Sequence, residues 1–291
     1  MSEKTYKPPI THTIASILRA VAGTPDPKNF TSAVICAAGS STRMGADTTK
    51  QFILLDGIPV VAHTLMAYEA ADTIHEIIVV AREDEIPLYD GFKEQYHLTK
   101  LTHVVAGGET RQDSARIGSD EVDKRCRFIA VADAARCLIT PEEIQKVCHA
   151  AYQWGAASAG TKATDTVKMV DKSAFVESTA DRNYVWMAQT PQVCALGIYR
   201  AAAYACRDEK FAATDDNQMI EHIHIPVKMV KCHRENIKIT EPEDLLFAHA
   251  ILDARRRMAE EAARVAAEAA AKATEEAVYQ RAREQVEIFL W

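Results

Sequence analysis

Short apolar runs alternate with amphipathic segments along most of the chain. The runs predict buried strands at residues 33–38, 76–81, 101–106 and 128–132. The segments between them repeat apolar residues at helical spacing, which predicts helices at 60–71, 86–97, 114–123 and 141–154. Alternating strands and helices are typical of a parallel, doubly wound sheet with helices on both faces. We therefore expect a Rossmann-like α/β fold, in which ligands lie beyond the carboxyl ends of the strands.

Polar turn residues interrupt this alternation after residue 155. Residues 166–170 and 174–177 predict two short strands around the turn Asp171-Lys172-Ser173. Together they form a protruding hairpin arm at about 160–182. Sheet-forming residues then return at 182–190 and 225–230.

The C-terminal region predicts one long helix. Thr240 and Glu243 have the spacing of a capping box, with a proline near the first turn. Residues 251–286 contain no Gly or Pro, and their apolar residues recur at sevens in a thin stripe that Lys272 interrupts. This pattern is typical of a long solvated helix or a weak coiled coil. The expected divisions are a helical or frayed leader at 1–30, a main domain at 31–252 and a helical extension at 253–291.

Composition and charge exclude several classes of protein. The 291 residues include 34 basic and 41 acidic side chains, and the net charge of −7 argues against a general nucleic-acid surface. Seven cysteines without a C-x-x-C pair argue against a disulfide framework and a structural zinc site. Residues 1–9 lack the apolar core of a signal peptide, and no apolar run is long enough to span a membrane. We therefore expect a cytoplasmic protein.

A polar loop with two cations follows the first predicted strand. Gly39 lets the backbone approach a ligand, Arg43 supplies a fixed fork of donors, and Lys50 supplies a mobile charge. Backbone N–H groups at the carboxyl end of a strand also favour anions. The loop is neither a P-loop nor a dinucleotide fingerprint, because both motifs are missing. The residues alone allow a polyphosphate site or a plain turn with two solvated cations.

Two further loops fall at the same predicted edge of the sheet. In one, Gly108 and Arg111 precede Ser114 at a helix start. The backbone and the hydroxyl there either read a base edge or simply cap the helix. In the other, Asp133 directly follows a buried strand. A lone aspartate at such a position is often a cap, but beside a triphosphate it is a natural Mg²⁺ ligand.

Polar residues later in the chain are candidates for binding a second, phosphorylated substrate. Thr166 and Arg182 flank the arm, and Lys238 lies just before the capped helix. Their hydroxyl, guanidinium and ammonium groups suit a phosphate. Each side chain is equally typical of a solvated surface, so only the combination with the loops above favours a site.

Several blocks of sequence carry a resemblance to a known family. They are AAGSSTRMG, TKQF, GIPVVAHTL, GGETRQDS, DAAR, ATDTVK, DRNYVW, QTPQ, ATDD and NIKITEPEDL. In this order, from residue 37 to about residue 245, they resemble the 2-C-methyl-D-erythritol 4-phosphate cytidylyltransferase family. The resemblance implies transfer of CMP from CTP to 2-C-methyl-D-erythritol 4-phosphate in non-mevalonate isoprenoid biosynthesis. The products would be 4-diphosphocytidyl-2-C-methyl-D-erythritol and pyrophosphate.

The resemblance also implies a role for each matching residue. The nucleotide would be lined by Ala37, Ala38 and Gly39 and its cytosine recognised by Gly108 and Ser114, with support from Arg111. The β- and γ-phosphates would be held by Arg43 and Lys50, the α-phosphate by Lys238 and the Mg²⁺ ion by Asp133. The acceptor would be bound by Thr166, Arg182, Thr190 and Thr214. Arg182 would reach across a homodimer formed by exchanged arms.

A few positions depart from the family pattern. Ala132 and Cys137 stand where the family usually has His and Pro, and Asn217-Gln218 replace the end of the family's T-D-[DE]-A-S stretch. Two alternatives stay open: a cytidylyltransferase for another polyol phosphate, such as ribitol 5-phosphate, and a non-catalytic scaffold that acts through its C-terminal helix. The scaffold is disfavoured because the chain retains all four charged residues of the expected site: Arg43, Lys50, Asp133 and Lys238.

Overall fold

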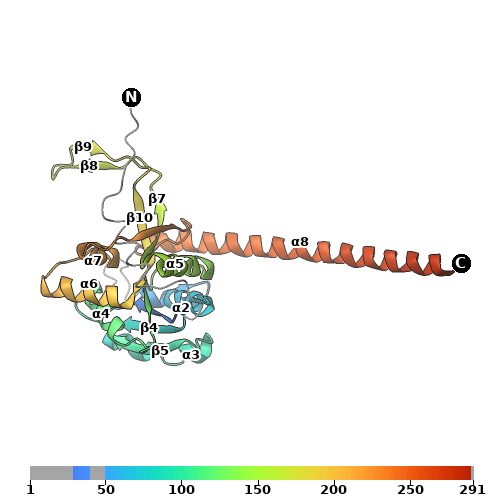
Figure 1. Cartoon of the computed structure of the whole chain (residues 1–291), viewed down its shortest axis with the longest axis horizontal. Helices are drawn as coiled ribbons and strands as arrows, with labels where there is room; N and C mark the ends of the chain where they lie inside the picture. Colours follow the sequence, from blue (N-terminus) through green and yellow to red (C-terminus); the bar gives the residue numbers. More distant parts are fainter. Residues whose placement is uncertain (1–28, 40–49, 290–291) are drawn as a thin grey trace. The chain divides into compact units, whose positions relative to one another are not determined.

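The computed structural model describes residues 29–39 and 50–289. The main structural feature of the described chain is a seven-stranded sheet (Figure 1). The strand order is β11-β7-β10-β6-β1-β4-β5. The strands are β1 (Thr31–Cys36), β4 (Glu76–Ala81), β5 (Leu101–Ala106), β6 (Phe128–Asp133), β7 (Ala156–Lys162), β10 (Trp186–Ala195) and β11 (Lys228–Lys231). The helix expected in the leader, at 10–21, lies outside the described residues.

Most neighbouring strands run parallel, as the alternating pattern predicts. β1 pairs in parallel with β4 and β6, β4 with β5, and β11 with β7. The exception is β10, which runs antiparallel to both β6 and β7. β7 and β10 are the two legs of the arm, and neighbouring strands joined by a hairpin are antiparallel. The doubly wound sheet is therefore confirmed, with one reversed strand.

Helices on both faces of the sheet enclose two apolar clusters. One cluster includes α2 (Val60–Ala70) and α5 (Pro141–Trp154). The other includes α4 (Arg111–Asp120), α6 (Leu196–Asp208) and α7 (Asp216–His222). The neighbours Val34 and Ile35 of β1 belong to different clusters, because successive strand side chains point to opposite faces. The sheet is thus the middle layer of three.

Some helices differ from the sequence prediction. The segment at 86–97 is divided into a 3₁₀-helix, η2 (Glu83–Tyr89), and a short α3 (Phe92–Gln95). Gly91, with a φ of +83°, separates the two. The sequence prediction also omitted α6 and α7. In contrast, α5 spans the predicted residues, and Thr140 caps its N-terminus.

The start of α4 changes the interpretation of the loop before it. The helix begins at Arg111, because Thr110 is the N-cap and its hydroxyl accepts a 3.0 Å hydrogen bond from the backbone N–H of Asp113. The prediction of a helix start at Ser114 is therefore wrong. Arg111 lies in the first helical turn, where the helix fixes its direction.

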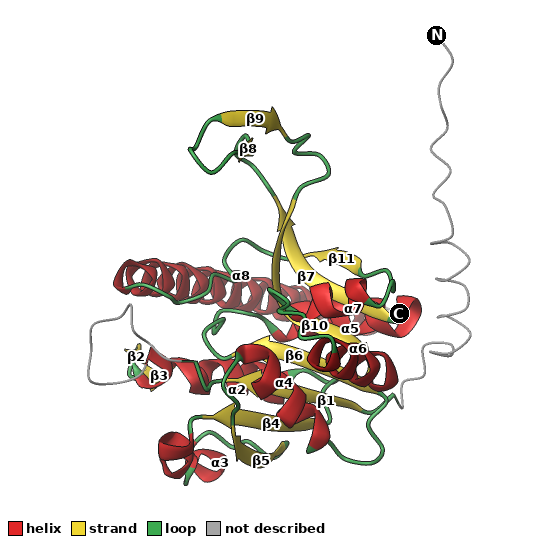
Figure 2. Ribbon diagram, turned by 90° about the vertical axis from the view of Figure 1, so that its left-hand side faces the viewer, coloured by secondary structure: helices red, strands yellow, loops and turns green. Residues whose placement is uncertain are grey.

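Small antiparallel hairpins lie outside the main sheet. β2 (Leu54–Leu55) and β3 (Ile58–Pro59) follow the 3₁₀-helix η1 (Lys50–Phe52). β8 (Lys168–Val170) and β9 (Val176–Thr179) form the arm, which extends beyond the ends of β7 and β10 (Figure 2). The carboxylate of Asp171 accepts hydrogen bonds from the backbone N–H groups of Ser173 and Phe175, both at 2.9 Å. The predicted hairpin and its turn are confirmed.

The chain divides into two compact units, one ending at Asp244 and the other beginning at Leu245. α8 (Pro242–Phe289) starts in the first unit and forms the second. Its cap uses Asp244 rather than the predicted Glu243: one Asp244 oxygen accepts from the backbone N–H and hydroxyl of Thr240, at 2.7 and 2.9 Å. The single long helix is confirmed. In the described part of the chain, no helix has both the length and the apolar character needed to cross a membrane.

Candidate active site

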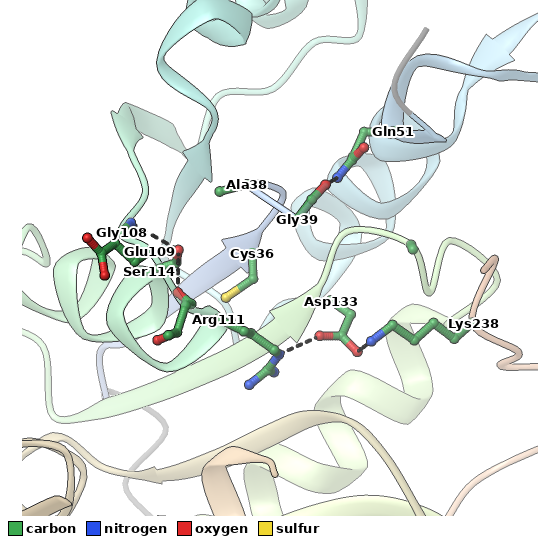
Figure 3. Close-up of a pocket in the computed structure, with 12 residues that line it drawn as sticks. Cys36, Ala38, Gly39, Gln51, Gly108, Glu109, Arg111, Ser114, Asp133 and Lys238 are labelled. Carbon is green, nitrogen blue, oxygen red and sulfur yellow. Dashed lines mark hydrogen bonds and ion pairs between the residues drawn. The ribbon is translucent and has the colours of Figure 1, made fainter. Parts of the chain in front are cut away.

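A pocket of about 430 Å³ opens at the carboxyl ends of β1 and β6 (Figure 3). Four loops, the two strand ends, η1 and the start of α4 bring its lining together from distant parts of the sequence. The lining residues are Cys36, Ala38, Gly39, Gln51, Gly108, Glu109, Thr110, Arg111, Ser114, Asp133, Ala135 and Lys238. Most of the predicted nucleotide and metal residues therefore meet in one cavity.

Asp133 lies at the end of β6 between two cations. Its Oδ1 accepts a 2.9 Å hydrogen bond from Nε of Arg111, and its Oδ2 lies 2.8 Å from Nζ of Lys238 (Figure 3). Burial alone would raise the pKa of this carboxyl, but the charges of Arg111 and Lys238 outweigh burial and hold the pKa well below its usual range. Asp133 is therefore ionised at neutral pH.

Thr190 supports this carboxylate from the neighbouring strand. Its hydroxyl accepts a 3.1 Å hydrogen bond from the backbone N–H of Asp133. β10 carries Thr190 next to β6 because the two strands pair in register beside this point. Thr190, predicted from the resemblance alone, is thus in contact with the predicted metal ligand.

A second carboxylate, Asp216, anchors Arg111. Nη1 of Arg111 lies 2.7 Å from Oδ2 of Asp216, whose side chain is only 1% exposed. The hydroxyl of Tyr199 donates to the other oxygen of Asp216 at 3.2 Å. The charge of Asp216, helped by that of Asp133, outweighs the lowering effect of burial and raises the pKa of Arg111 above its usual value. The guanidinium is therefore held between two carboxylates.

The sequence prediction did not include Asp216 among the site residues. The signal available was the Asp215-Asp216 pair in the ATDD block, which was interpreted only through Thr214. Asp215 caps α7 by accepting from the backbone N–H of Gln218 at 2.9 Å. The cap places Asp216 in the first turn of α7, directed at Arg111.

Two glycines let the loop before α4 pack closely. A Cβ on Gly107 would lie 2.5 Å from Cβ of Ala38 and 2.7 Å from Oγ of Ser114. A Cβ on Gly108 would lie 2.5 Å from Cβ of Asp113. The backbone N–H of Gly108 donates to Oγ of Ser114 at 3.1 Å. Larger residues would therefore force this loop away from the loop after β1.

Gln51 ties the other side of the pocket together and was also missed as a site residue. Its Nε2 donates to the carbonyl oxygens of Ala37 at 2.6 Å and Gly39 at 3.3 Å. The loop after β1 is thereby tied to η1. Arg43 lies outside the described residues, and Lys50 is described only in its backbone, at the start of η1.

The other predicted acceptor residues lie apart from this pocket. Among the described residues, the lining does not include Thr166, Arg182 or Thr214. Arg182 donates to the carbonyl oxygen of Thr164 at 3.2 Å, at the base of the arm. Thr214 donates its backbone N–H to Oε1 of Gln218 at 2.7 Å. Within one chain, the structure therefore brings only Thr190 of the acceptor set to the site.

Three of the four departures from the family pattern are at buried positions, and the fourth, Gln218, is partly exposed. Ala132 in β6 and Cys137 after it are 1% and 5% exposed, and neither lines the pocket as described. Asn217 donates its backbone N–H to Oε1 of Gln192 at 2.9 Å, which fixes α7 to β10. These substitutions therefore act on packing around the site rather than on its charges.

Comparison with known proteins decides the family. The family model described as 2-C-methyl-D-erythritol 4-phosphate cytidylyltransferase matches residues 31–254. The chain belongs to this family. A relative of that name from Pelotomaculum thermopropionicum is 41% identical over 230 residues, covering 78% of this chain and 97% of the relative. Another, from Caldanaerobacter subterraneus, is 39% identical and covers 76% and 98%.

Solved structures agree with this membership. The 4-diphosphocytidyl-2C-methyl-D-erythritol synthase of Anaerococcus prevotii has a TM-score of 0.70 and 32% identity, covering 77% of this chain and 96% of its own. The cytidylyltransferase of Francisella tularensis has a TM-score of 0.63 and 27% identity. The predicted family and fold are confirmed, while most of α8 lies beyond the matched residues.

Proposed function

We propose that this member of the cytidylyltransferase family transfers CMP from CTP to 2-C-methyl-D-erythritol 4-phosphate and releases pyrophosphate. The observation that carries the proposal is the position of Asp133. Its ionised carboxylate is held between Arg111 and Lys238 in a pocket at the edge of the sheet. A carboxylate surrounded by cations suits a reaction in which two phosphate-bearing substrates meet. The family match over residues 31–254 supports both substrates.

The reaction needs charge neutralisation more than proton transfer. The acceptor phosphate is already anionic at neutral pH, so one of its oxygens can attack the α-phosphorus of CTP without a general base. A new P–O bond forms, and the bond from the α-phosphorus to the leaving pyrophosphate breaks. Arg43, Lys50 and Lys238 would offset the repulsion between the anions and the charge on the leaving oxygen. In-line positioning would lower the barrier by up to about 7–11 kcal/mol.

Nucleotidyltransferases generally use a divalent cation, which we take to be Mg²⁺. The described residues contain no group of three metal-ligating side chains, but Mg²⁺ commonly binds one carboxylate together with substrate phosphates and water. Asp133 fits that role. Of the two cations between which Asp133 is held, Lys238 is the one that can move away and leave Oδ2 of Asp133 free for the metal. Its side chain is 36% exposed, whereas Arg111 is anchored by Asp216. When bound, the cation would neutralise phosphate charge, and the released Lys238 would reach the α-phosphate.

Cytosine recognition would come from the loop before α4. Its position is fixed, because the Gly108 N–H and the Ser114 hydroxyl are bonded to each other and Ser114 also donates to the carbonyl of Thr110 at 2.9 Å. A rigid loop of this kind suits the edge of a base. The backbone at Ala37, Ala38 and Gly39, tied down by Gln51, would line the rest of the nucleotide.

The acceptor would be bound by two chains of a homodimer. Thr190 is beside Asp133, whereas Thr166 and Arg182 lie on the arm and Thr214 precedes α7. The arm exposes large apolar side chains, including Phe175 at 73% and Val176 at 59%. Exposed apolar groups on a projecting hairpin suit a protein–protein contact. Exchange of arms would bring Arg182 of one chain to the pocket of the other.

The alternatives are weaker. The matched relatives carry the methylerythritol phosphate name, and nothing in the site favours ribitol 5-phosphate or a scaffold that lacks catalysis. Pyrophosphate release from CTP, measured with a panel of polyol phosphates, tests the proposal. We expect release with 2-C-methyl-D-erythritol 4-phosphate and little with ribitol 5-phosphate. Equal or preferred use of ribitol 5-phosphate would overturn the acceptor assignment. Cytoplasmic location remains a prediction for cell fractionation.

A further inference from the structure

α8 continues far beyond the part of the chain that the family shares. The family match ends at residue 254, whereas α8 ends at Phe289. This chain covers 97% of the Pelotomaculum relative with only 78% of its own length, so the shared reaction does not need the extension. Every residue from 256 to 270 is exposed. Most helical stability in proteins comes from packing of an apolar face against another segment, so an exposed helix of this length suits a packing partner.

An apolar seam follows one side of the helix with an 11-residue period. The seam consists of Ile251, Ala254, Met258, Ala262, Val265, Ala269 and Ala273. An 11-residue repeat, about 3.67 residues per turn, keeps these positions on one side of the helix. Met258 is 73% exposed and Val265 52% exposed. The heptad interpretation placed Lys272 within the seam, whereas the 11-residue period places it on the flank.

The two flanks of this seam differ in character. One flank carries charges of strictly alternating sign: Asp253, Arg257, Glu261, Arg264, Glu268 and Lys272. From residue 259 to residue 270 the other flank consists of small residues: Ala259, Ala263, Ala266 and Ala270. Because the charged series begins with an acid and ends with a base, reading it backwards reverses the sign at every position.

We propose that α8 pairs with α8 of a second copy of this chain, antiparallel, with the two-fold axis near Ala262. In this arrangement Arg257 faces Glu268 and Glu261 faces Arg264, and the symmetry repeats each contact. Asp253 faces Lys272 in the same way. Met258 then packs beside Val265 across the seam, so large apolar residues meet at the centre.

Charge complementarity selects the antiparallel orientation. Like flanks meet in an antiparallel pair of helices, so the charged flanks of the two copies face each other. In a parallel pair the charged flank of one helix faces the alanine flank of the other, so Arg257, Glu261, Arg264 and Glu268 face alanines rather than opposite charges. Flanking charges are the usual determinants of partner and orientation in helical pairs.

The same alternation also stabilises a single helix. Arg264 lies 2.7 Å from Glu261 and 3.0 Å from Glu268 within one α8. Exposed pairs of this kind stabilise a single helix only weakly. The test must therefore distinguish ion pairs within one helix from ion pairs between two helices.

Charge-swapped variants of the full chain make that distinction. One variant, Arg257→Glu/Arg264→Glu, has an acidic flank, and the other, Glu261→Arg/Glu268→Arg, has a basic flank. Each also carries Ala262→Cys as a cross-linking reporter, because the natural cysteines are all buried except the half-buried Cys36. We expect a disulfide-linked dimer from the parent Ala262→Cys chain, loss of it in each variant alone and recovery when the two are mixed. Pairing only within a helix predicts no recovery on mixing.

Two control variants test the geometry of the proposed helix pair. Arg256→Glu/Glu260→Arg changes charges away from the seam and should leave the Ala262→Cys cross-link intact. Ala254→Cys should give little cross-link, because residue 254 of one copy lies about 25 Å along the axis from residue 254 of the other in the antiparallel pair. Efficient cross-linking at residue 254, absence of cross-linking in the parent chain, or failure of the mixture to recover it would each overturn the proposal.

Discussion

The guanidinium of Arg111 lies 2.7 Å from the buried carboxylate of Asp216, across 105 positions of the sequence. On its other side the same guanidinium donates to Asp133 at 2.9 Å. Asp216 therefore acts on the site through Arg111, as a positioning residue. The α7 helix, which begins at Asp216, is part of the support of the candidate active-site pocket.

Asp216→Asn should weaken this support without changing its shape. The neutral amide leaves Arg111 without its buried counter-charge, so we expect a fall in kcat and a loss of up to about 3 kcal/mol in the free energy of unfolding. Denaturant unfolding and steady-state kinetics measure the two effects. Asp215→Asn is the matched control, because asparagine caps a helix nearly as well as aspartate. Equal effects of the two substitutions would contradict a specific role for Asp216.

Asp133→Asn should nearly abolish turnover while the protein stays folded. The substitution keeps the shape of the side chain but removes the charge that we assign to the metal. Near-native activity at saturating Mg²⁺ would show the metal assignment to be wrong. Circular dichroism and pyrophosphate release on the same preparation provide the comparison.

The same substitution has a predicted pH signature. The folded pKa of Asp133 is lowered, so its ionised form contributes stability above the unfolded value, near 3.9, and loses it as the pH falls toward the folded pKa. The native chain should therefore exceed Asp133→Asn in stability at neutral pH, and the gap should narrow below about pH 4. Chemical unfolding at several pH values measures the gap, and a constant gap would contradict the ionised state.

Sequence patterns predicted local features better than distant contacts. The strands at 76–81 and 101–106 and the helix at 141–154 match β4, β5 and α5 residue for residue, because apolar runs and a helix cap are local signals. The reversed direction of β10 was missed, since strand orientation depends on the neighbours with which the strand pairs. Asp216 and Gln51 were missed because their partners lie far away or on the backbone, where residue type gives no indication.

Lys50→Ala should lower kcat by about 10²–10³-fold, by analogy with loss of a donor to a developing oxyanion. The lysine would stabilise the leaving pyrophosphate, so its loss should affect the chemical step more than CTP binding. Single-turnover measurements separate the two. An unchanged chemical step with weaker CTP binding would restrict Lys50 to a binding role.

Arg182→Ala should raise KM for the acceptor much more than KM for CTP. The residue lies on the arm, bonded to the carbonyl of Thr164, and we assign it to the acceptor phosphate of the partner chain. Mixed dimers of Arg182→Ala and Lys50→Ala chains should regain part of the activity, since one of their two sites is then intact. Verified mixed dimers without recovery would mean that Arg182 does not act across chains.

Deletion of residues 255–291 should leave the kinetics of both substrates nearly unchanged. The removed segment lies beyond the family match, and none of its described residues lines the pocket. The oligomeric state seen by light scattering should change if the copies pair through α8. A large fall in kcat with oligomeric state and melting temperature unchanged would place the extension in the active site.

The ion pairs that join Arg111 to Asp216 and Asp133 to Lys238 also determine when the site can form. Each links segments about a hundred residues apart, so it must close a long loop before it contributes any energy. Ribosomal synthesis proceeds from the N-terminus, and α7 and Lys238 emerge only after most of the first unit. A nascent chain that stops before them holds the sheet edge and Asp133 but lacks the partners of Asp133 and Arg111. The contacts that hold Asp133 and Arg111 are therefore completed late in synthesis, after the loops before α4 and after β6 have already left the ribosome.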